Sequence, residues 1–386
     1  MKILVGGDLV PTESNFNQFI SGDVNFLFGE KLCEILDNAE IRIFNLEVPL
    51  SDFANPISKS GPNLIAPSAV IKGIKKINPS CLGIANNHIL DHGEQGFHST
   101  VKILEDNKIT FVGGGENIAE ASKPIILEKD GIKIGIYACA ETEFSIAAKT
   151  SCGANPFDVF ESFDHVSDLK TKVDFVIVLY HGGREHYRYP SPGLQKRCRK
   201  FVRNGADLVV CQHSHCIGCK EEFLNGTIVY GQGNFIFDDC DNEYWATSLL
   251  LNVDVKRDCF LVDYIPLKKC AERVCLANTS ESQKLLEDFF RRSDEIKQED
   301  FIIKKYSEFS LEKVLNYLSG FCGKMRKFLP YRVLNKILRR YLIKNNWSLK
   351  DLLFIQNSIR CEAHRELLLE GLQNLIDNKK EEIKCL

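Results

Sequence analysis

The chain has 386 residues, 44% hydrophobic and 26% charged, which is typical of a globular protein with one large domain and an appendage. A formal net charge of -3 and a pI of about 6.3 exclude a basic field over the whole surface, so nucleic acid is not expected as a partner. The first residues contain too few apolar side chains for a signal-peptide core, and no later run approaches a membrane span. We therefore expect a soluble or peripheral protein.

Short β-branched runs alternate with helical patterns through the first part of the chain. The predicted strands are Ile3–Val5, Ile41–Phe44, Cys81–Ala85, Thr110–Val112, Ile132–Ala138, Val173–Tyr180, Asp207–Cys211, Thr227–Tyr230, Ser248–Val253 and Cys259–Ile265. The predicted helices between them include Phe28–Asn38, Glu94–Asn107, Phe157–Lys172 and Pro192–Asn204. This alternation predicts a layered α/β fold.

Beyond about Leu276 the pattern changes to charged, apolar helices without strand signals, so we expect a first domain over 1–275 and an α-helical C-terminal extension over 276–386. Within this extension, the stretch Gly320–Ser348 contains eight basic residues and no acidic one. Its basic part, 324–344, is predicted to form an amphipathic helix. Packing on its own domain is the preferred interpretation of this helix, and peripheral contact with anionic lipid is the alternative.

Fifteen cysteines are dispersed along the chain. Because they are dilute and odd in number, we interpret them as reduced thiols, which together with the absence of a signal sequence predicts a cytoplasmic location, with peripheral attachment to the inner face of the membrane as the alternative. The pair Cys216-x-x-Cys219 is similar to half of a zinc knuckle or to a redox pair, but a second cysteine pair is missing. Free thiols are the preferred interpretation.

Metal-ligating side chains follow several of the predicted strands. These residues are Asp8, Glu47, Asn87, His88, His181, His213, His215 and Asn234. In open α/β sheets, ligands bind at the carboxyl ends of the strands, where loops converge on one crevice. Carboxylates, an amide and imidazoles, without cysteine, suit one or two ions of Mn²⁺, Fe²⁺/³⁺ or Zn²⁺.

The order of the motifs around these residues resembles that of the CapA (PGA_cap) family of capsule and poly-γ-glutamate biosynthesis proteins. The matching motifs are Gly7-Asp8, Asn45-Leu46-Glu47, Ala85-Asn86-Asn87-His88 with Asp91, His181-Gly182-Gly183-Arg184-Glu185, His213-Ser214-His215 and Tyr230-Gly231-Gln232-Gly233-Asn234-Phe235. The resemblance covers about residues 1–240. It implies a fold of the calcineurin-like metallophosphoesterase type, a layered β-sandwich flanked by helices.

The same resemblance implies roles for single residues. It implies Asp8 and His215 on one metal ion, Asn87, His181 and His213 on a second, and Glu47 as the bridge. His88 would be the acid or charge stabiliser of the reaction. Asp91 is either the residue that orients His88 or a cap of the helix predicted near Glu94. Arg184, Glu185 and Asn234 are candidates for substrate binding, although Arg184 and Glu185 are equally explained as a surface ion pair.

Two departures from the general phosphoesterase pattern are shared with the CapA branch. The usual Asp-x-His motif is Asp8-Leu9-Val10 here, and Glu47 replaces the usual bridging aspartate. The first metal would therefore be short of one ligand. The sequence supports two hypotheses: a metal-dependent hydrolase acting on an anionic polymer or phosphoester, and a metal-binding accessory protein that works with capsule-synthesis enzymes.

Overall fold

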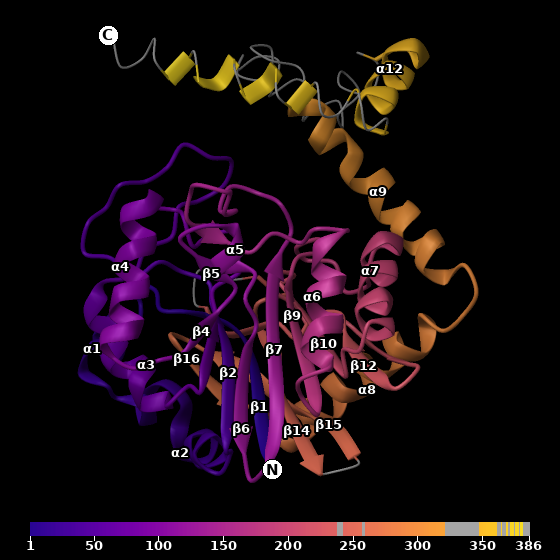
Figure 1. The fold of residues 1–386 in the computed structure, drawn as a ribbon. Coiled ribbons are helices and arrows are strands. Elements are labelled where there is room, and N and C mark those ends of the chain that lie inside the picture. The colour runs from indigo at the N-terminus through magenta and orange to yellow at the C-terminus, as the bar shows by residue number, and fades with distance from the viewer. Residues whose placement is uncertain are drawn as a thin grey trace. The chain divides into compact units, whose positions relative to one another are not determined.

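A computed structural model describes residues 1–237, 242–256, 259–320 and 347–360, together with 364, 368–369, 371–373, 375–377 and 379–380. The chain divides into two compact units, Met1–Lys304 and Lys305–Leu386 (Figure 1). This division falls later than the boundary expected at Leu276. The reason is that helix α8 (Thr279–Glu295) packs on the first unit, where Phe289 is buried among the apolar side chains between the strands.

The first sheet has β1 (Lys2–Val10) near its centre and the strand order β16-β15-β14-β1-β2-β3-β4. Its other members are β2 (Ile41–Leu46), β3 (Cys81–Gly83), β4 (Phe111–Val112), β13 (Asn234–Phe237), β14 (Thr247–Lys256), β15 (Cys259–Cys270) and β16 (Arg273–Leu276). Strands β1 to β4 run parallel, and β13 also pairs in parallel with β1. The hairpin strands β14 to β16 are antiparallel.

The second sheet has the order β11-β12-β10-β9-β7-β6. Its members are β6 (Ile125–Lys129), β7 (Ile132–Ala140), β9 (Phe175–His181), β10 (Leu208–Gln212), β11 (Lys220–Phe223) and β12 (Gly226–Val229). The central strands β7, β9, β10 and β12 are parallel. A small ribbon of β5 (Gly114–Gly115) and β8 (Gly153–Ala154) stands apart from both sheets.

The two sheets pack face to face, and helices cover their outer faces. Along β1, Ile3 and Val5 point toward the second sheet and Leu4 points toward the helices, which is the alternation expected of a strand. Along β9, Ile177 likewise points inward while Val178 packs against the outer helices. Because both faces of central strands such as β9 and β10 are buried, these strands read as continuous apolar runs in the sequence. The predicted layered α/β sandwich is confirmed.

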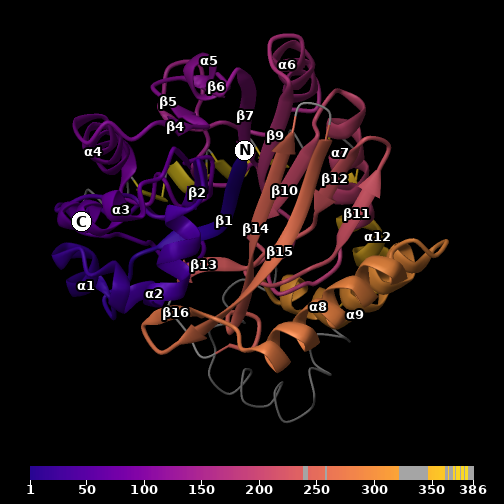
Figure 2. The ribbon, with the colours of Figure 1, turned by 90° about the horizontal axis from the view of Figure 1, so that it is seen from below.

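One group of helices covers the first sheet and another covers the second (Figure 1 and Figure 2). On the first sheet lie α1 (Phe16–Ser21), α2 (Val24–Asp37), the 3-10 turn η1 (Ser68–Val70), α3 (Ile71–Ile77) and α4 (Gly93–Asp106). On the second lie α6 (Glu161–Lys170) and α7 (Pro192–Arg203), and the short α5 (Ile118–Ala121) contacts β5 and β8. The helices support the strands from outside, so the carboxyl ends of the parallel strands of both sheets are held rigidly.

The expected α-helical extension is confirmed by α9 (Phe301–Gly320) and α12 (Leu349–Arg360). The basic stretch 324–344, predicted to be an amphipathic helix, lies outside the described residues. Among the helices that the structure describes, none has both the length and the apolar composition that a membrane crossing requires.

Candidate metal centre

A backbone irregularity in β1 sets the position of Asp8. The first half of β1 pairs with β14, whereas Asp8 pairs with Asn234 of β13, and the register shifts between the two halves. Gly7 allows this change of partner, because a Cβ atom at residue 7 would lie only 2.0 Å from the carbonyl oxygen of Gly233. The Gly7-Asp8 motif therefore reflects a close approach of two backbones that places the Asp8 carboxylate beside β13.

The predicted ligands converge from both sheets. Asp8 and Glu47 come from β1 and from the end of β2 in the first sheet, while His181 is the last residue of β9 in the second. His213 and His215 follow β10, the parallel neighbour of β9. The carboxyl ends of the central strands thus meet at one point between the sheets.

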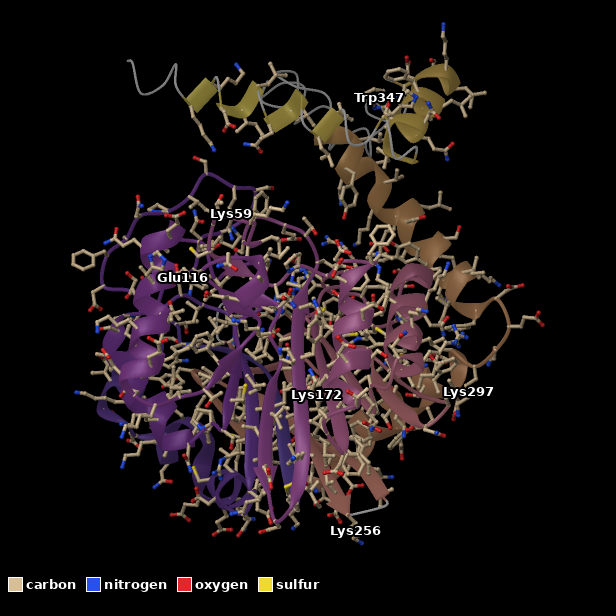
Figure 3. All side chains as sticks on the ribbon, in the orientation of Figure 1. Lys59, Glu116, Lys172, Lys256, Lys297 and Trp347 are labelled. Atoms are coloured by element: carbon tan, nitrogen blue, oxygen red, sulfur yellow. The ribbon has the colours of Figure 1, made fainter. Side chains whose placement is uncertain are left out.

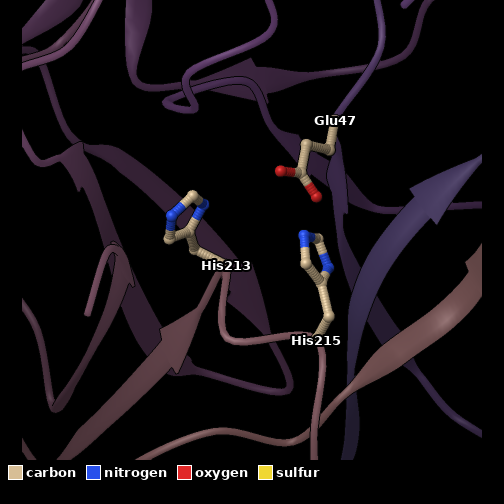
Figure 4. A group of neighbouring side chains, drawn as sticks. All are labelled: Glu47, His213 and His215. Carbon is tan, nitrogen blue, oxygen red and sulfur yellow. The ribbon is translucent and has the colours of Figure 1, made fainter. Parts of the chain in front are cut away.

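Two overlapping groups of ligand atoms form at this point. The carboxylates of Asp8 and Glu47 and the ring of His181 form one group, in which the ligand atoms lie within 4.8 Å of one another. Glu47, His213 and His215 form the second, which is shown in Figure 4. All five side chains are buried. Glu47 belongs to both groups, which is the sharing that a bridging ligand would need.

Asn87 and His88 follow β3 and extend the cluster. Asn87 Oδ1 lies 3.0 Å from Nε2 of His181. His88 Nδ1 lies 2.5 Å from Oδ2 of Asp91, and Asp91 is fully buried. Helix α4 begins at Gly93 with no side-chain cap, so Asp91 contacts His88 and does not cap this helix.

Two asparagines that the sequence reasoning left without a role hold the ligands. Asn45 Nδ2 donates to Oδ1 of Asp8 at 2.7 Å and lies 3.2 Å from Nδ1 of His181. Asn86 Nδ2 in turn donates to Oδ1 of Asn45 at 3.2 Å. Nε2 of the same His181 ring faces Glu47 Oε1, 3.1 Å away, so Asn45 and Glu47 contact the two ring nitrogens of His181. Both asparagines stand in motifs quoted above, but only the fold shows what they touch.

The donor set fits a divalent cation. Both carboxylate oxygens of Glu47 are buried and have no hydrogen-bond partner among the described residues, although His181 Nε2 lies 3.1 Å from Oε1 as an ion-pair contact. A buried carboxylate without hydrogen bonds is costly, and a bound cation lowers that cost. In addition, His213 and His215 adopt left-handed backbone conformations with φ of 79° and 52°, which are uncommon for non-glycine residues.

Burial and charge act against each other on the ligand pKa values. Burial alone would raise the pKa of Asp8, but its contacts with His215 and His181 lower it well below the usual range. Burial would lower the pKa of His215, yet Glu47 and Asp8 raise it to about 9, and Glu47 likewise raises the pKa of His181. For His213, burial and the two neighbouring histidines together lower the pKa well below its usual value. The carboxylates of Asp8 and Glu47 thus favour the charged forms of His181 and His215.

The family described as "Bacterial capsule synthesis protein PGA_cap" matches residues 2–239. The chain belongs to this family. Capsule biosynthesis protein CapA of Bacillus anthracis is 30% identical over 213 residues, which cover 53% of this chain and 52% of that protein. PGA biosynthesis protein CapA of Bacillus subtilis (strain 168) is 31% identical over 172 residues, 44% of this chain and 45% of that protein. The chain spans about half the length of the curated relatives it matches.

Among solved structures, a 5'-nucleotidase precursor from Thermus thermophilus is similar at 14% identity with a TM-score of 0.43, over 75% of this chain and 58% of that chain. The PGA_cap match confirms the resemblance drawn from the sequence motifs.

Val10 is the position at which this chain differs from the Asp-x-His motif. The Asp-x-His motif of phosphoesterases has a histidine at this position, whereas here Val10 is 1% exposed and packs in the apolar core. It offers no donor atom to an ion beside Asp8. Asn234 is the first residue of β13, a strand that the sequence did not predict. Its Oδ1 lies 2.8 Å from Nδ1 of His215.

The remaining substrate candidates of this PGA_cap chain lie toward the surface. Arg184 and Glu185 face each other at 3.8 Å between Nη1 and Oε2, and both side chains are substantially exposed. Glu185 also approaches the cluster, with Oε1 4.0 Å from Nε2 of His213. Cys216 and Cys219 are buried free thiols in the structure and take no part in the two ligand groups.

One contact at the site could not be found from the sequence. Lys59, in the loop after Glu47, makes an ion pair with Oδ1 of Asp91, and its Nζ lies 3.2 Å from Nδ1 of His88. A lysine in a segment rich in serine, glycine and proline is normally solvated, so composition offers no signal for such a contact.

Proposed function

We propose that the chain is a metal-dependent hydrolase of the phosphoesterase type that acts in capsule polysaccharide or poly-γ-glutamate biosynthesis. The observation that carries this proposal is the buried carboxylate of Glu47, which lacks hydrogen bonds and belongs to both groups of ligand atoms. A carboxylate in that situation suits a bridge between two cations, and a bridged pair of cations suits the cleavage of a phosphoester.

The metal-holding residues would be Asp8, Glu47, Asn87, His181, His213 and His215. Their mixed oxygen and nitrogen donors, with no thiolate among them, favour Mn²⁺, Fe²⁺/³⁺ or Zn²⁺. Such ions, when bound, supply a Lewis acid for a phosphoryl oxygen and lower the pKa of water to near neutrality. Asn45 keeps Asp8 and His181 in place for this task, since its amide contacts both side chains.

His88 is proposed as the group that gives a proton to the leaving oxygen. Its Nδ1 is engaged by Asp91, so Nε2 is the ring atom that remains for a substrate. His88 also lies near enough to His213 for its charge to lower the pKa of that residue. An acid placed beside the ligand cluster would stabilise the charge that develops on the leaving group.

The proposed substrate is an anionic polymer or a phosphoester, with Arg184, Glu185 and Asn234 nearest to it and capsule-synthesis enzymes as partners. The names of the Bacillus relatives, which refer to capsule and PGA biosynthesis, support this choice. The dispersed thiols support a cytoplasmic location, and the acid-free basic stretch 324–344 supports peripheral contact with the inner face of the membrane.

A second function is favoured by one observation. Because Val10 is a buried apolar residue, the position beside Asp8 lacks the imidazole that a complete first metal site would have. A site that holds metal weakly or without turnover would suit a non-catalytic accessory protein for polymer assembly or export.

The test measures metal content and turnover together. Protein purified without chelator is analysed for metal and assayed on phosphodiester and phosphomonoester substrates, for the wild type, H213A and the control H98A, whose histidine pairs with Glu116 on the surface. We expect bound metal and turnover in the wild type and H98A, and loss of both in H213A. Metal without turnover on any ester would favour the accessory function. Absence of metal from the wild type in both preparation and titration would contradict the proposed site.

A further inference from the structure

The loop 51–67 carries one lysine whose side chain is almost completely buried. This irregular segment connects the residues after Glu47 to η1, and most of it is exposed, including Ser58 and Ser60 on either side of Lys59. Lys59 is labelled in Figure 3. The Lys59 side chain is only 2% exposed. Burying an ammonium group is costly unless it is paired, so its partners must account for its position.

The partner of Lys59 is Asp91. Nζ of Lys59 donates to Oδ1 of Asp91, while Oδ2 of the same carboxylate lies 2.5 Å from Nδ1 of His88 and accepts from the backbone N–H of Leu64 at 2.6 Å. The backbone carbonyl of Asp91 also accepts from the N–H of Ile57 at 2.9 Å. Asp91 therefore contacts His88 and is bonded to three residues of the loop, Ile57, Lys59 and Leu64.

These contacts assign the proton on the His88 ring. Lysine has donors only, so Nζ of Lys59 cannot accept a proton from Nδ1 of His88. The carboxylate oxygen 2.5 Å away can, and a charge-assisted bond of this kind is the shortest and strongest available to the ring. His88 Nδ1 then donates to Oδ2 of Asp91, and Lys59 occupies Oδ1. Oδ1 accepts from Lys59, and Oδ2 accepts from His88 and from the Leu64 N–H, so the carboxylate cannot rotate without breaking at least one of these bonds.

We propose that Lys59 is a positioning residue: its ammonium group fixes Asp91, and Asp91 fixes the ring of His88 with Nε2 directed to the substrate. Because Lys59 belongs to the loop 51–67, this series of contacts forms only when the loop packs against Asp91. His88 is then held as the proton donor. This inference rests on the proposed hydrolase function, and it adds a residue that neither the metal ligands nor the sequence motifs include.

Substrates with different leaving groups distinguish a positioning role of Lys59 from a general structural effect. A p-nitrophenolate leaves without help from an acid, whereas an alkoxide needs a proton. In the full metal-loaded chain, K59M is expected to retain its metal and to lose about 10- to 100-fold in kcat on alkyl phosphodiesters, with a much smaller loss on p-nitrophenyl phosphodiesters. K59R should recover part of the difference because it restores a cation. The control K102M removes an exposed lysine paired with Asp106 and should change neither rate.

A readout independent of turnover follows the His88 ring directly. The Nδ1–H proton bonded to Asp91 should give a downfield proton NMR signal that is absent in H88A, present in the wild type and K102M, and lost in K59M. If K59M does not fold, K59Q, which keeps a donor without the charge, takes its place. An equal loss of rate on both substrate types, or a signal unchanged by either variant, would overturn the positioning role. If the wild type turns over no ester, the proposed function fails, and the NMR signal alone decides whether Lys59 positions His88.

Discussion

The close approach of β1 and β13 at Gly7 predicts a combined loss of stability and metal in G7A. An added Cβ would lie 2.0 Å from the carbonyl oxygen of Gly233, whereas real Cβ atoms essentially never come closer than 3.0 Å to another heavy atom. The obstructing atom belongs to the backbone and cannot rotate away, so the two strands must separate by about 1 Å. Overpacking of this kind costs about 1–3 kcal/mol.

The same separation acts on the ligand cluster, because Asp8 is the next residue and pairs with Asn234. We expect the melting temperature of G7A to fall by several degrees, since about 1 kcal/mol corresponds to roughly 2–4 °C in a domain of this class. Bound metal, measured by elemental analysis, should fall in parallel. In the control G193A, the new Cβ meets nothing closer than 3.8 Å, so this helix variant should be neutral or slightly stabilised. Unchanged melting and metal content in G7A would refute the argument.

Two further predictions concern stability. R42A removes a buried guanidinium that donates to the carbonyls of Leu36, Ala39 and Asn78. We expect the free energy of unfolding, measured by denaturant titration, to fall by about 2–4 kcal/mol. The control R291A breaks only exposed ion pairs, so its free energy of unfolding should stay within about 0.5 kcal/mol of the wild type. Removal of metal by a chelator should lower the melting temperature, and ions restored at about 100 times their Kd should return about 2.7 kcal/mol. A melting temperature insensitive to both chelator and ions would contradict a folded-state metal site.

Much of the fold was predictable because each layer leaves a local pattern. Buried parallel strands such as β9 appear as continuous β-branched runs, and the amphipathic periods of α4 and α7 mark helices that pack on one side. The predicted helix Phe157–Lys172 begins later in the structure, at Glu161, because the Asp158 side chain accepts hydrogen bonds from the backbone just before it. The first residue of a helix depends on such local bonds between side chain and backbone more than on hydrophobic periodicity.

The boundary at Leu276 illustrates a limit of composition. Helix α8 has the charged, apolar character of the later helices, but Phe289 enters the core between the sheets and Ser293 accepts a hydrogen bond from the backbone of Lys220. Whether an amphipathic helix packs on the preceding unit or on the following one is not encoded in its own period. Long-range contacts decide this, so the first compact unit extends to Lys304.

The sequence by itself determined the donor chemistry of the candidate site, because oxygen and nitrogen ligands placed just after strands must gather at one edge of an α/β fold. Only the tertiary structure decided which atoms meet there. The shared position of Glu47, the support that Asn45 gives to His181, and the burial of Lys59 against Asp91 all join segments far apart in the chain. Such contacts depend on the register of two sheets and on the path of a loop, and neither leaves a periodic trace in the sequence.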